Sequence, residues 1–239
     1  MWPGYFKDEL HIGYVTNGVH FPTWTANGMR KLYSKYFPEG FSQHQYNISA
    51  WHKVHDNPNE EICNEHVRLK VRLFKLVPRR FYAREQTNFV SPRDMVGIEE
   101  TLNQKSLTIG FARRFATYKR AHLLFTDLNR LEAIVNDPDR PVRFIFAGKA
   151  HPNDIPGQDL IKRIVEVAAM PQFMGKDIFL PNYDMDIALG MVQVGNVWLN
   201  TPTRTVEARD TSEKTCVMNR LSEVSVVDGR RVGGAESGP

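Results

Sequence analysis

The sequence has few cysteines and no long apolar run. Among its 239 residues are two cysteines, Cys63 and Cys216, which lie far apart in the chain. This argues against a disulfide-stabilised scaffold and favours a reducing compartment. The sequence also lacks the roughly 18 consecutive apolar residues of a membrane-spanning helix, and its start, MWPGYFKDEL, lacks the regions of a signal peptide. We therefore expect a cytoplasmic protein.

A strong charge of one sign is missing as well. Thirty-one basic and 27 acidic residues leave a formal net charge of +4, too mild to indicate a polyanion-binding chain. Neither a Walker loop nor a G-x-G-x-x-G motif follows the first predicted strand, so the backbone cradle of common nucleotide sites is absent. Phe115 and Tyr118 alone accompany the main basic cluster, too few aromatics for a nucleic-acid-binding stripe.

Residues 1–103 are predicted to form a helical and connecting segment. Ile62, Leu69 and Leu73 recur at helical spacing and predict one long helix from about Glu60. Pro78 is expected to end or kink that helix. A linker is expected over 88–97.

Four residues near this helix have spacings found in zinc sites, namely His52, His55, Cys63 and His66. His66, however, lies in the apolar stripe of the predicted helix. A hydrogen-bonded core histidine beside a buried thiol is therefore the preferred interpretation, and no metal site is predicted.

Residues 104–229 change to short apolar runs that alternate with helical patterns, and residues 230–239 are predicted to be a flexible tail. Strands are expected over 107–112, 142–148, 177–180, 197–200 and 224–227, and helices over 118–134, 158–170 and 185–193. Strands that are apolar on both faces and alternate with helices indicate a parallel sheet covered on both sides. The predicted fold class is α/β, with a Rossmann-like, doubly wound parallel sheet.

The segment IGFARRFATYKRAHLLF, residues 109–125, concentrates cations where the first strand gives way to a helix. Thr117 is expected to cap that helix, which puts Lys119 and Arg120 in its first turn. The helix macrodipole disfavours cations there. A bound anion such as phosphate at the carboxyl edge of the sheet explains them. Surface cations paired with neighbouring acids explain them about equally well.

Five motifs in order resemble the α-glucan phosphorylases, and more narrowly the shorter bacterial and archaeal branch of the glycogen and maltodextrin phosphorylases. They are YVTNGVHFPTW, GFARRFATYKRA, FAGKAHP, FLPNYDMDIA and EARDTSEK. The resemblance covers about Tyr14 to Gly229 and implies the C-terminal, cofactor-bearing half of a glycosyltransferase-B fold, without its N-terminal domain. It implies transfer of glucose from an α-1,4-glucan to inorganic phosphate, with release of glucose 1-phosphate and with pyridoxal phosphate as cofactor.

The resemblance also implies roles for matching residues. Arg114 and Lys119 would bind the substrate phosphate as catalytic residues. The substrate-binding residues for the sugar would be Asn17, Tyr118 and Glu207. The cofactor-binding residues would be Trp24, Arg113, Tyr183, Thr211, Ser212 and Lys214. Such a cluster suits the chemistry, because two phosphoryl groups in contact repel each other unless cations surround them.

The last motif departs from the family pattern. The position of the family's cofactor lysine is Thr215, which cannot form a Schiff base, and Lys214 lies one residue too early, about 100° away on a helix. Arg209 and Asp210 replace a small pair that approaches the sugar. We therefore expect a phosphorylase fragment that does not catalyse phosphorolysis alone, with the missing N-terminal domain or a second copy as partner. Two alternatives stay open: a non-catalytic remnant that binds anions or a partner, and a nucleotide-sugar glycosyltransferase resembling glycogen synthase.

Overall fold

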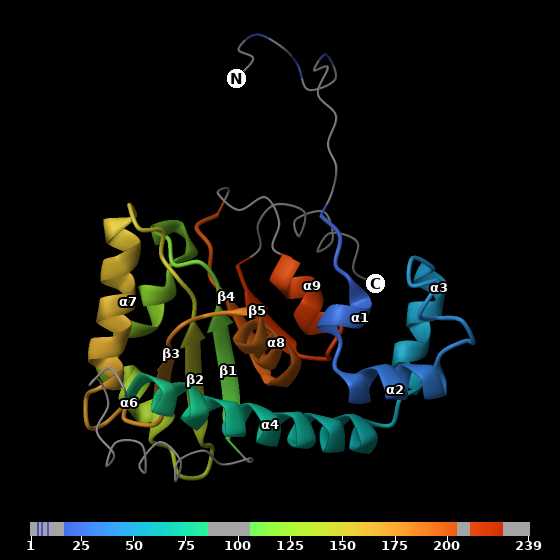
Figure 1. Cartoon of the computed structure of the whole chain (residues 1–239), viewed down its shortest axis with the longest axis horizontal. Coiled ribbons are helices and arrows are strands. Elements are labelled where there is room, and N and C mark those ends of the chain that lie inside the picture. The colour runs from blue at the N-terminus through green and yellow to red at the C-terminus, as the bar shows by residue number, and fades with distance from the viewer. Residues whose placement is uncertain are drawn as a thin grey trace.

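The computed structural model describes residues 17–85, 106–204 and 211–226, together with positions 4, 6 and 9. Within this part of the chain, strands form one sheet (Figure 1). The strands are β1 (Leu107–Ala112), β2 (Val142–Ala147), β3 (Asp177–Leu180), β4 (Val197–Asn200) and β5 (Ser222–Ser225). Their order is β3-β2-β1-β4-β5, and every neighbouring pair is parallel. The predicted α/β class and parallel sheet are confirmed.

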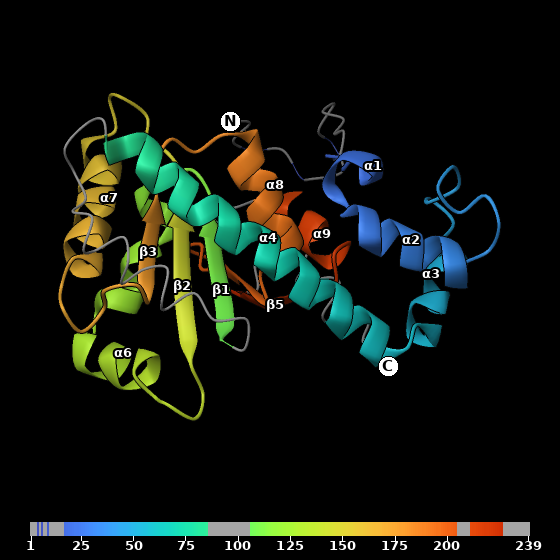
Figure 2. The same ribbon diagram turned by 60° about the horizontal axis from the view of Figure 1, so that its bottom comes forward.

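Helices cover both faces of the sheet (Figures 1 and 2). On one face lie α6 (Leu128–Val135) and α7 (Ile155–Ala168); on the other lie α4 (Asn59–Glu85), α8 (Met185–Val194) and α9 (Thr211–Val217). Successive residues of β2 serve different faces, since Phe144 packs in the first core and Ile145 in the second. A strand that is apolar on both faces is buried between two helical layers. This is the doubly wound arrangement predicted from the alternating pattern.

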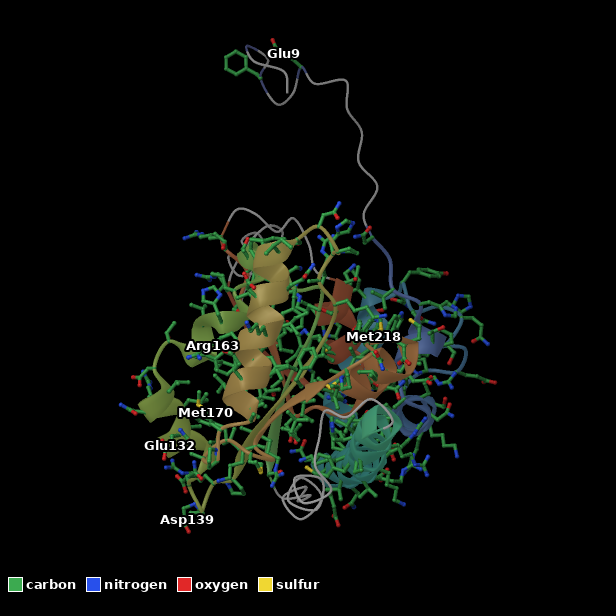
Figure 3. The ribbon with its side chains drawn as sticks, turned by 60° about the vertical axis from the view of Figure 1, so that its left-hand side comes forward. Glu9, Glu132, Asp139, Arg163, Met170 and Met218 are labelled. Carbon is green, nitrogen blue, oxygen red and sulfur yellow. The ribbon has the colours of Figure 1, made fainter. Side chains whose placement is uncertain are left out.

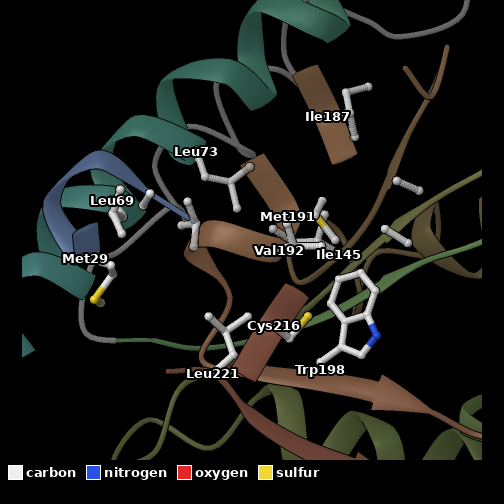
Figure 4. Close-up of a cluster of buried hydrophobic side chains, with 14 of the residues drawn as sticks. Met29, Leu69, Leu73, Ile145, Ile187, Met191, Val192, Trp198, Cys216 and Leu221 are labelled. Atoms are coloured by element: carbon white, nitrogen blue, oxygen red, sulfur yellow. The ribbon is translucent and has the colours of Figure 1, made fainter. Parts of the chain in front are cut away.

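The core beneath α4 and α8 joins the N-terminal helices to the sheet. Figure 4 shows Leu73 of α4 close to Met191 and Val192 of α8, with Trp198 of β4 beneath them. The helices α1 (Phe21–Trp24), α2 (Asn27–Tyr36) and α3 (Ile48–Trp51) and the 3-10 turn η2 (His52–Asp56) contribute side chains, many of them aromatic, to the same core. The Tyr33 hydroxyl donates to the carbonyl of Met218 at 2.8 Å. These helices therefore share one hydrophobic core with the sheet.

The long helix differs from its prediction at its C-terminal end. It begins at Asn59, as expected, but it passes through Pro78 and continues to Glu85. Proline inside a helix costs about 3 kcal/mol. Leu73 and Val77, 2% and 0% exposed, anchor the turns before Pro78 in the core, and this burial offsets the cost. The predicted linker over 88–97 and the predicted tail lie outside the described residues.

The interpretation of His66 is wrong in two respects. Cys63 is exposed, and the Nδ1 atom of His66 has no hydrogen-bond partner among the described residues. Burial lowers the pKa of His66 and so favours its neutral form. No group of three metal-ligating side chains occurs in the described ranges. No described helix combines the length and apolarity needed to cross a membrane.

Candidate active site

The strand order places the carboxyl ends of β1 and β4 at the point where the sheet changes its direction of winding. In open α/β sheets, ligands bind at such a point. Arg113 follows β1 directly and is 5% exposed. Its guanidinium donates to Oδ1 of Asn200, the last residue of β4. The Asn200 amide in turn donates to the Glu213 carboxylate at 2.5 Å and to the Ser225 hydroxyl at 3.0 Å. Asn200 of β4 thus holds Arg113 in place, and residues of α9 and β5 hold Asn200.

A close backbone approach supports this arrangement. Gly148 follows β2 with a φ of +152°, and a Cβ atom there would lie 1.9 Å from the carbonyl oxygen of Arg113. Only glycine fits such a contact. The backbone that follows β2 therefore packs closely against the backbone that follows β1, and this contact restricts the backbone of Arg113.

The helix predicted over 118–134 is interrupted. Its first part is the 3-10 turn η3 (Thr117–Lys119), and Arg120 then adopts the left-handed conformation with φ 48°. A second 3-10 turn, η4 (Ala121–Phe125), follows, and α6 begins only at Leu128, capped by Asp127. Thr117 is therefore not the helix cap, and the predicted conflict between Lys119, Arg120 and a helix dipole does not arise.

Arg120 instead joins two loops at this edge of the sheet. Its Nε and one terminal nitrogen donate to the carbonyls of Thr201 and Pro202 at 3.0 and 2.8 Å. In the opposite direction, the Thr201 hydroxyl donates to the Lys119 carbonyl at 3.1 Å. The loop after β1 and the loop after β4 are thereby held side by side.

The remaining predicted phosphate-binding residues meet around one phenol ring. The Arg114 guanidinium lies 3.4 Å from the Tyr118 hydroxyl, and the Lys119 ammonium lies 5.1 Å from the centre of the same ring. Arg114 is exposed, whereas Lys119 is 8% exposed. The structure therefore brings Arg114, Tyr118 and Lys119 together, with one cation in solvent and one largely withdrawn from it.

A cavity of about 220 Å³ adjoins the end of β1. Four of the predicted cofactor residues line it, from α1, the loop before α8, and α9: Trp24, Tyr183, Thr211 and Ser212. The wall also includes Ala112, the residue directly before Arg113. Two aromatic side chains, two hydroxyls and the end of β1 thus surround one space, smaller than the roughly 300–1,000 Å³ of drug-sized ligand sites.

Position 215, where the sequence resemblance predicts the position of a cofactor lysine, also lines this cavity. Thr215 is 4% exposed, and its hydroxyl donates to the carbonyl of Ser212 at 2.7 Å. Lys214 is not among the lining residues; its ammonium donates to the carbonyl of Asn17 at 3.0 Å. No lysine or arginine lines the cavity among the described residues, so the wall offers no amine.

Other predicted residues are not brought into this group. Asn17 is exposed, and its backbone carbonyl makes the contact with Lys214. Glu207, Arg209 and Asp210 lie outside the described residues. Sequence reasoning did not single out Asn200 and Glu213, which position Arg113. The only signal for Asn200 is an amide residue at the carboxyl end of an otherwise apolar strand.

No protein-family model matches the chain. The chain is 43% identical to a glycogen phosphorylase of Aquifex aeolicus and 40% identical to a maltodextrin phosphorylase of Thermococcus litoralis, in each case over 96% of its length. A glycogen phosphorylase of Mycobacterium tuberculosis is 35% identical over 96%. These alignments cover 33%, 27% and 26% of the respective relatives. The chain therefore spans about a third or less of the length of these proteins.

Proposed function

We propose that this chain, which belongs to the α-glucan phosphorylase family, forms the phosphate- and cofactor-binding part of a glucan phosphorylase. The observation that carries the proposal is the 220 Å³ cavity beside Arg113, because side chains from distant segments converge there. For the complete enzyme we propose cleavage of α-1,4-glucan by inorganic phosphate with release of glucose 1-phosphate. The partner would be the remaining part of that enzyme or a second copy of the chain.

The residues of the cavity fit pyridoxal phosphate held without a covalent bond. Trp24 and Tyr183 offer aromatic walls for a pyridine ring, and the hydroxyls of Thr211 and Ser212 offer donors for its phosphate. Arg113 would add a fixed positive charge beside the cavity, and Lys214 would stay bound to the carbonyl of Asn17. When bound, the cofactor would supply a phosphoryl group for proton transfer beside the substrate phosphate.

Arg114 and Lys119 would bind the substrate phosphate. A guanidinium fork matches two phosphate oxygens, and an ammonium adds a compact charge. Because only 8% of Lys119 is exposed, solvent would screen its attraction for phosphate less than it screens that of Arg114. Tyr118, between the two cations, would contact the sugar together with Asn17 and Glu207.

Titration of the chain with pyridoxal phosphate tests the cofactor part of this proposal. The double variant Thr211→Ala/Ser212→Ala should bind pyridoxal phosphate about tenfold more weakly or worse, since two donors to a charged group are lost. Its affinity for pyridoxal, which lacks the phosphate, should stay unchanged. Calorimetry gives both constants.

A matched control removes two hydroxyls elsewhere. Ser34 and Thr126 are exposed, and their hydroxyls donate to nearby carbonyls. Ser34→Ala/Thr126→Ala should bind both compounds as the unchanged chain does. Equal affinity of the Thr211→Ala/Ser212→Ala variant for pyridoxal phosphate would contradict the proposed phosphate position.

A separate prediction concerns the substrate phosphate. Arg114→Ala should weaken binding of inorganic phosphate by about 1–2 kcal/mol. This is less than the roughly 1.5–3 kcal/mol typical of hydrogen bonds to charged groups, because Arg114 is exposed and solvent screens its charge. Amide chemical shifts of residues 113–120 report the binding. Arg163→Ala is the control, since Arg163 lies on α7 (Figure 3) and does not line the 220 Å³ cavity. Equal affinity of both variants would place the anion elsewhere.

A second candidate function is binding without catalysis, and Thr215 favours it because the cavity wall holds a hydroxyl where the family holds an amine. We expect no release of glucose 1-phosphate when this chain is mixed with maltodextrin, phosphate and pyridoxal phosphate. Measurable turnover would reject this candidate. We also propose a cytoplasmic location, supported by the free thiols of Cys63 and Cys216.

A further inference from the structure

A second and larger hollow lies on the other side of α8. It has a volume of about 440 Å³ and is bounded by α1, α2, α4 and α8. We call it the α4–α8 groove. Its volume falls in the range of ordinary small-molecule sites.

The groove is strongly cationic. Arg72, Lys75 and Arg79 line it from α4, at spacings of three and four residues that place them on one side of the helix. Arg30 of α2 lines it from the opposite wall, and Asp186 is the one carboxylate among its described lining residues. Four cations along one hollow repel each other, and an anionic ligand relieves this repulsion.

Two residues that line the groove carry a buried polar atom without a hydrogen-bond partner among the described residues. Thr25 is 2% exposed and lines the groove, and its hydroxyl has no hydrogen-bond partner among the described residues. The Nε atom of Arg30 likewise has none within that part of the chain. Buried donors of this kind are costly unless something accepts from them. The N-terminus of α2 adds to the positive potential, since Ala26 provides no capping side chain and the first turn holds no acid.

The groove is separate from the candidate active site. Along α8, Leu189 and Gln193 face the groove, whereas Ala188 and Val192 face the 220 Å³ cavity. Opposite sides of one helix therefore serve two different hollows. The inference does not depend on the proposed function, because no predicted phosphate or cofactor residue lines the groove.

We propose that the α4–α8 groove binds a small organic ligand with two or more phosphoryl groups. Arg72 and Arg79 are seven residues apart on α4, which separates their backbones by about 10 Å. A single phosphate reaches only part of such a row, whereas a polyphosphate or bisphosphate engages cations along its length. Arg30, across the groove, closes the site on its other side.

Inorganic tripolyphosphate is the probe for a test at fixed ionic strength, with amide shifts as the readout. Gly190 and Gln193 report on the groove, and Arg114 and Tyr118 report on the candidate active site. Arg72→Gln/Lys75→Gln changes two exposed positions. The affinity for tripolyphosphate, taken from the saturable shifts at Gly190 and Gln193, should fall at least about tenfold in this variant. The affinity taken from the shifts at Arg114 and Tyr118 should change less than about twofold.

The control variant removes the same charge from another surface. Lys162→Gln/Arg163→Gln on α7 should change the affinity at the groove less than about twofold. An equal loss of affinity at the groove in both double variants would mean that the anion is attracted by the overall positive charge of the chain, and it would overturn the proposal. Saturable shifts at Arg114 and Tyr118 with none at Gly190 would also overturn it, while supporting the proposed phosphate site. The two proposals therefore fail independently.

Discussion

Replacing Asp177 by asparagine is expected to make the fold more stable near neutral pH. Asp177 begins β3, is 2% exposed, and has no hydrogen-bond partner for either carboxylate oxygen among the described residues. Burial raises the pKa of this carboxyl to about 7. The folded state therefore prefers the protonated acid, and each ionised carboxylate must be buried at a cost.

The direction of the pH dependence follows from linkage. Between the unfolded pKa of 3.8 and the folded pKa of about 7, the native state binds more protons than the unfolded state. The free energy of unfolding therefore falls as pH rises through this window, and above it the loss is complete. Asp177→Asn removes the titration. Its stability relative to the unchanged chain should rise by about 2–3 kcal/mol between about pH 5 and about pH 8.

Urea denaturation at the two pH values measures this difference. The comparison cancels the intrinsic cost of burying an amide, because that cost is the same at both pH values. Asp159→Asn is the control for losing one carboxylate, since Asp159 is exposed on α7. If the difference in free energy of unfolding between Asp177→Asn and the unchanged chain does not vary with pH, the carboxyl is solvated or paired with a cation.

The predicted sheet and its first four strands could be obtained from the sequence because burial on both faces produces short runs of apolar residues. The last strand, predicted over 224–227, lies at Ser222–Ser225, where half-buried residues alternate with exposed ones. VRFIFAG and LTIGFA lack a continuous polar face, and such runs alternating with helices leave few topologies. The order of the strands then fixes which ends meet. Arg113 and Asn200 come together for that reason, although nothing local in the sequence marks Asn200 as its partner.

Predictions failed where tertiary contacts outweigh local preference. Periodicity over 118–134 is compatible with a continuous helix, but the contacts of Arg120 with Thr201 and Pro202 hold the chain in a left-handed turn. These partners lie far along the sequence and are invisible to a local pattern. Pro78 is the converse case. The residue normally ends a helix, but α4 continues past it because the helix is packed in the core.

The candidate site was predictable to the extent that its residues sit in recognisable motifs. Trp24, Tyr183, Thr211 and Ser212 were named from three separate motifs, and the structure gathers them around one cavity. The α4–α8 groove was not predicted. In the sequence, the cations of α4 that line this groove have the spacing of an ordinary solvent-exposed helix face. That face becomes one wall of the groove only because α4 packs against α8.

Introducing a lysine at position 215 is expected to create a covalent cofactor site. Thr215 lines the 220 Å³ cavity, and it lies on α9 between Thr211 and Val217. In Thr215→Lys, the new amine should condense with the aldehyde of pyridoxal phosphate and release water. Borohydride should then reduce the carbon–nitrogen double bond to a stable secondary amine. The peptide containing residue 215 should gain the mass of one reduced pyridoxyl phosphate group, which is absent from the unchanged chain at that position.

Surface lysines also react with aldehydes, so the control must carry one extra amine on the same helix. Val217→Lys meets this need, because Val217 is 58% exposed and lies two residues further along α9. Two helical residues turn the side chain by about 200°, away from the cavity. At low cofactor concentration, labelling of residue 215 in Thr215→Lys should exceed labelling of residue 217 in Val217→Lys at least about tenfold, because binding in the cavity raises the local concentration of aldehyde. Equal labelling at both positions would mean that the cavity does not hold the cofactor. Labelling of Lys214 in the unchanged chain would mean that this residue, one position earlier, reaches the aldehyde despite its contact with Asn17.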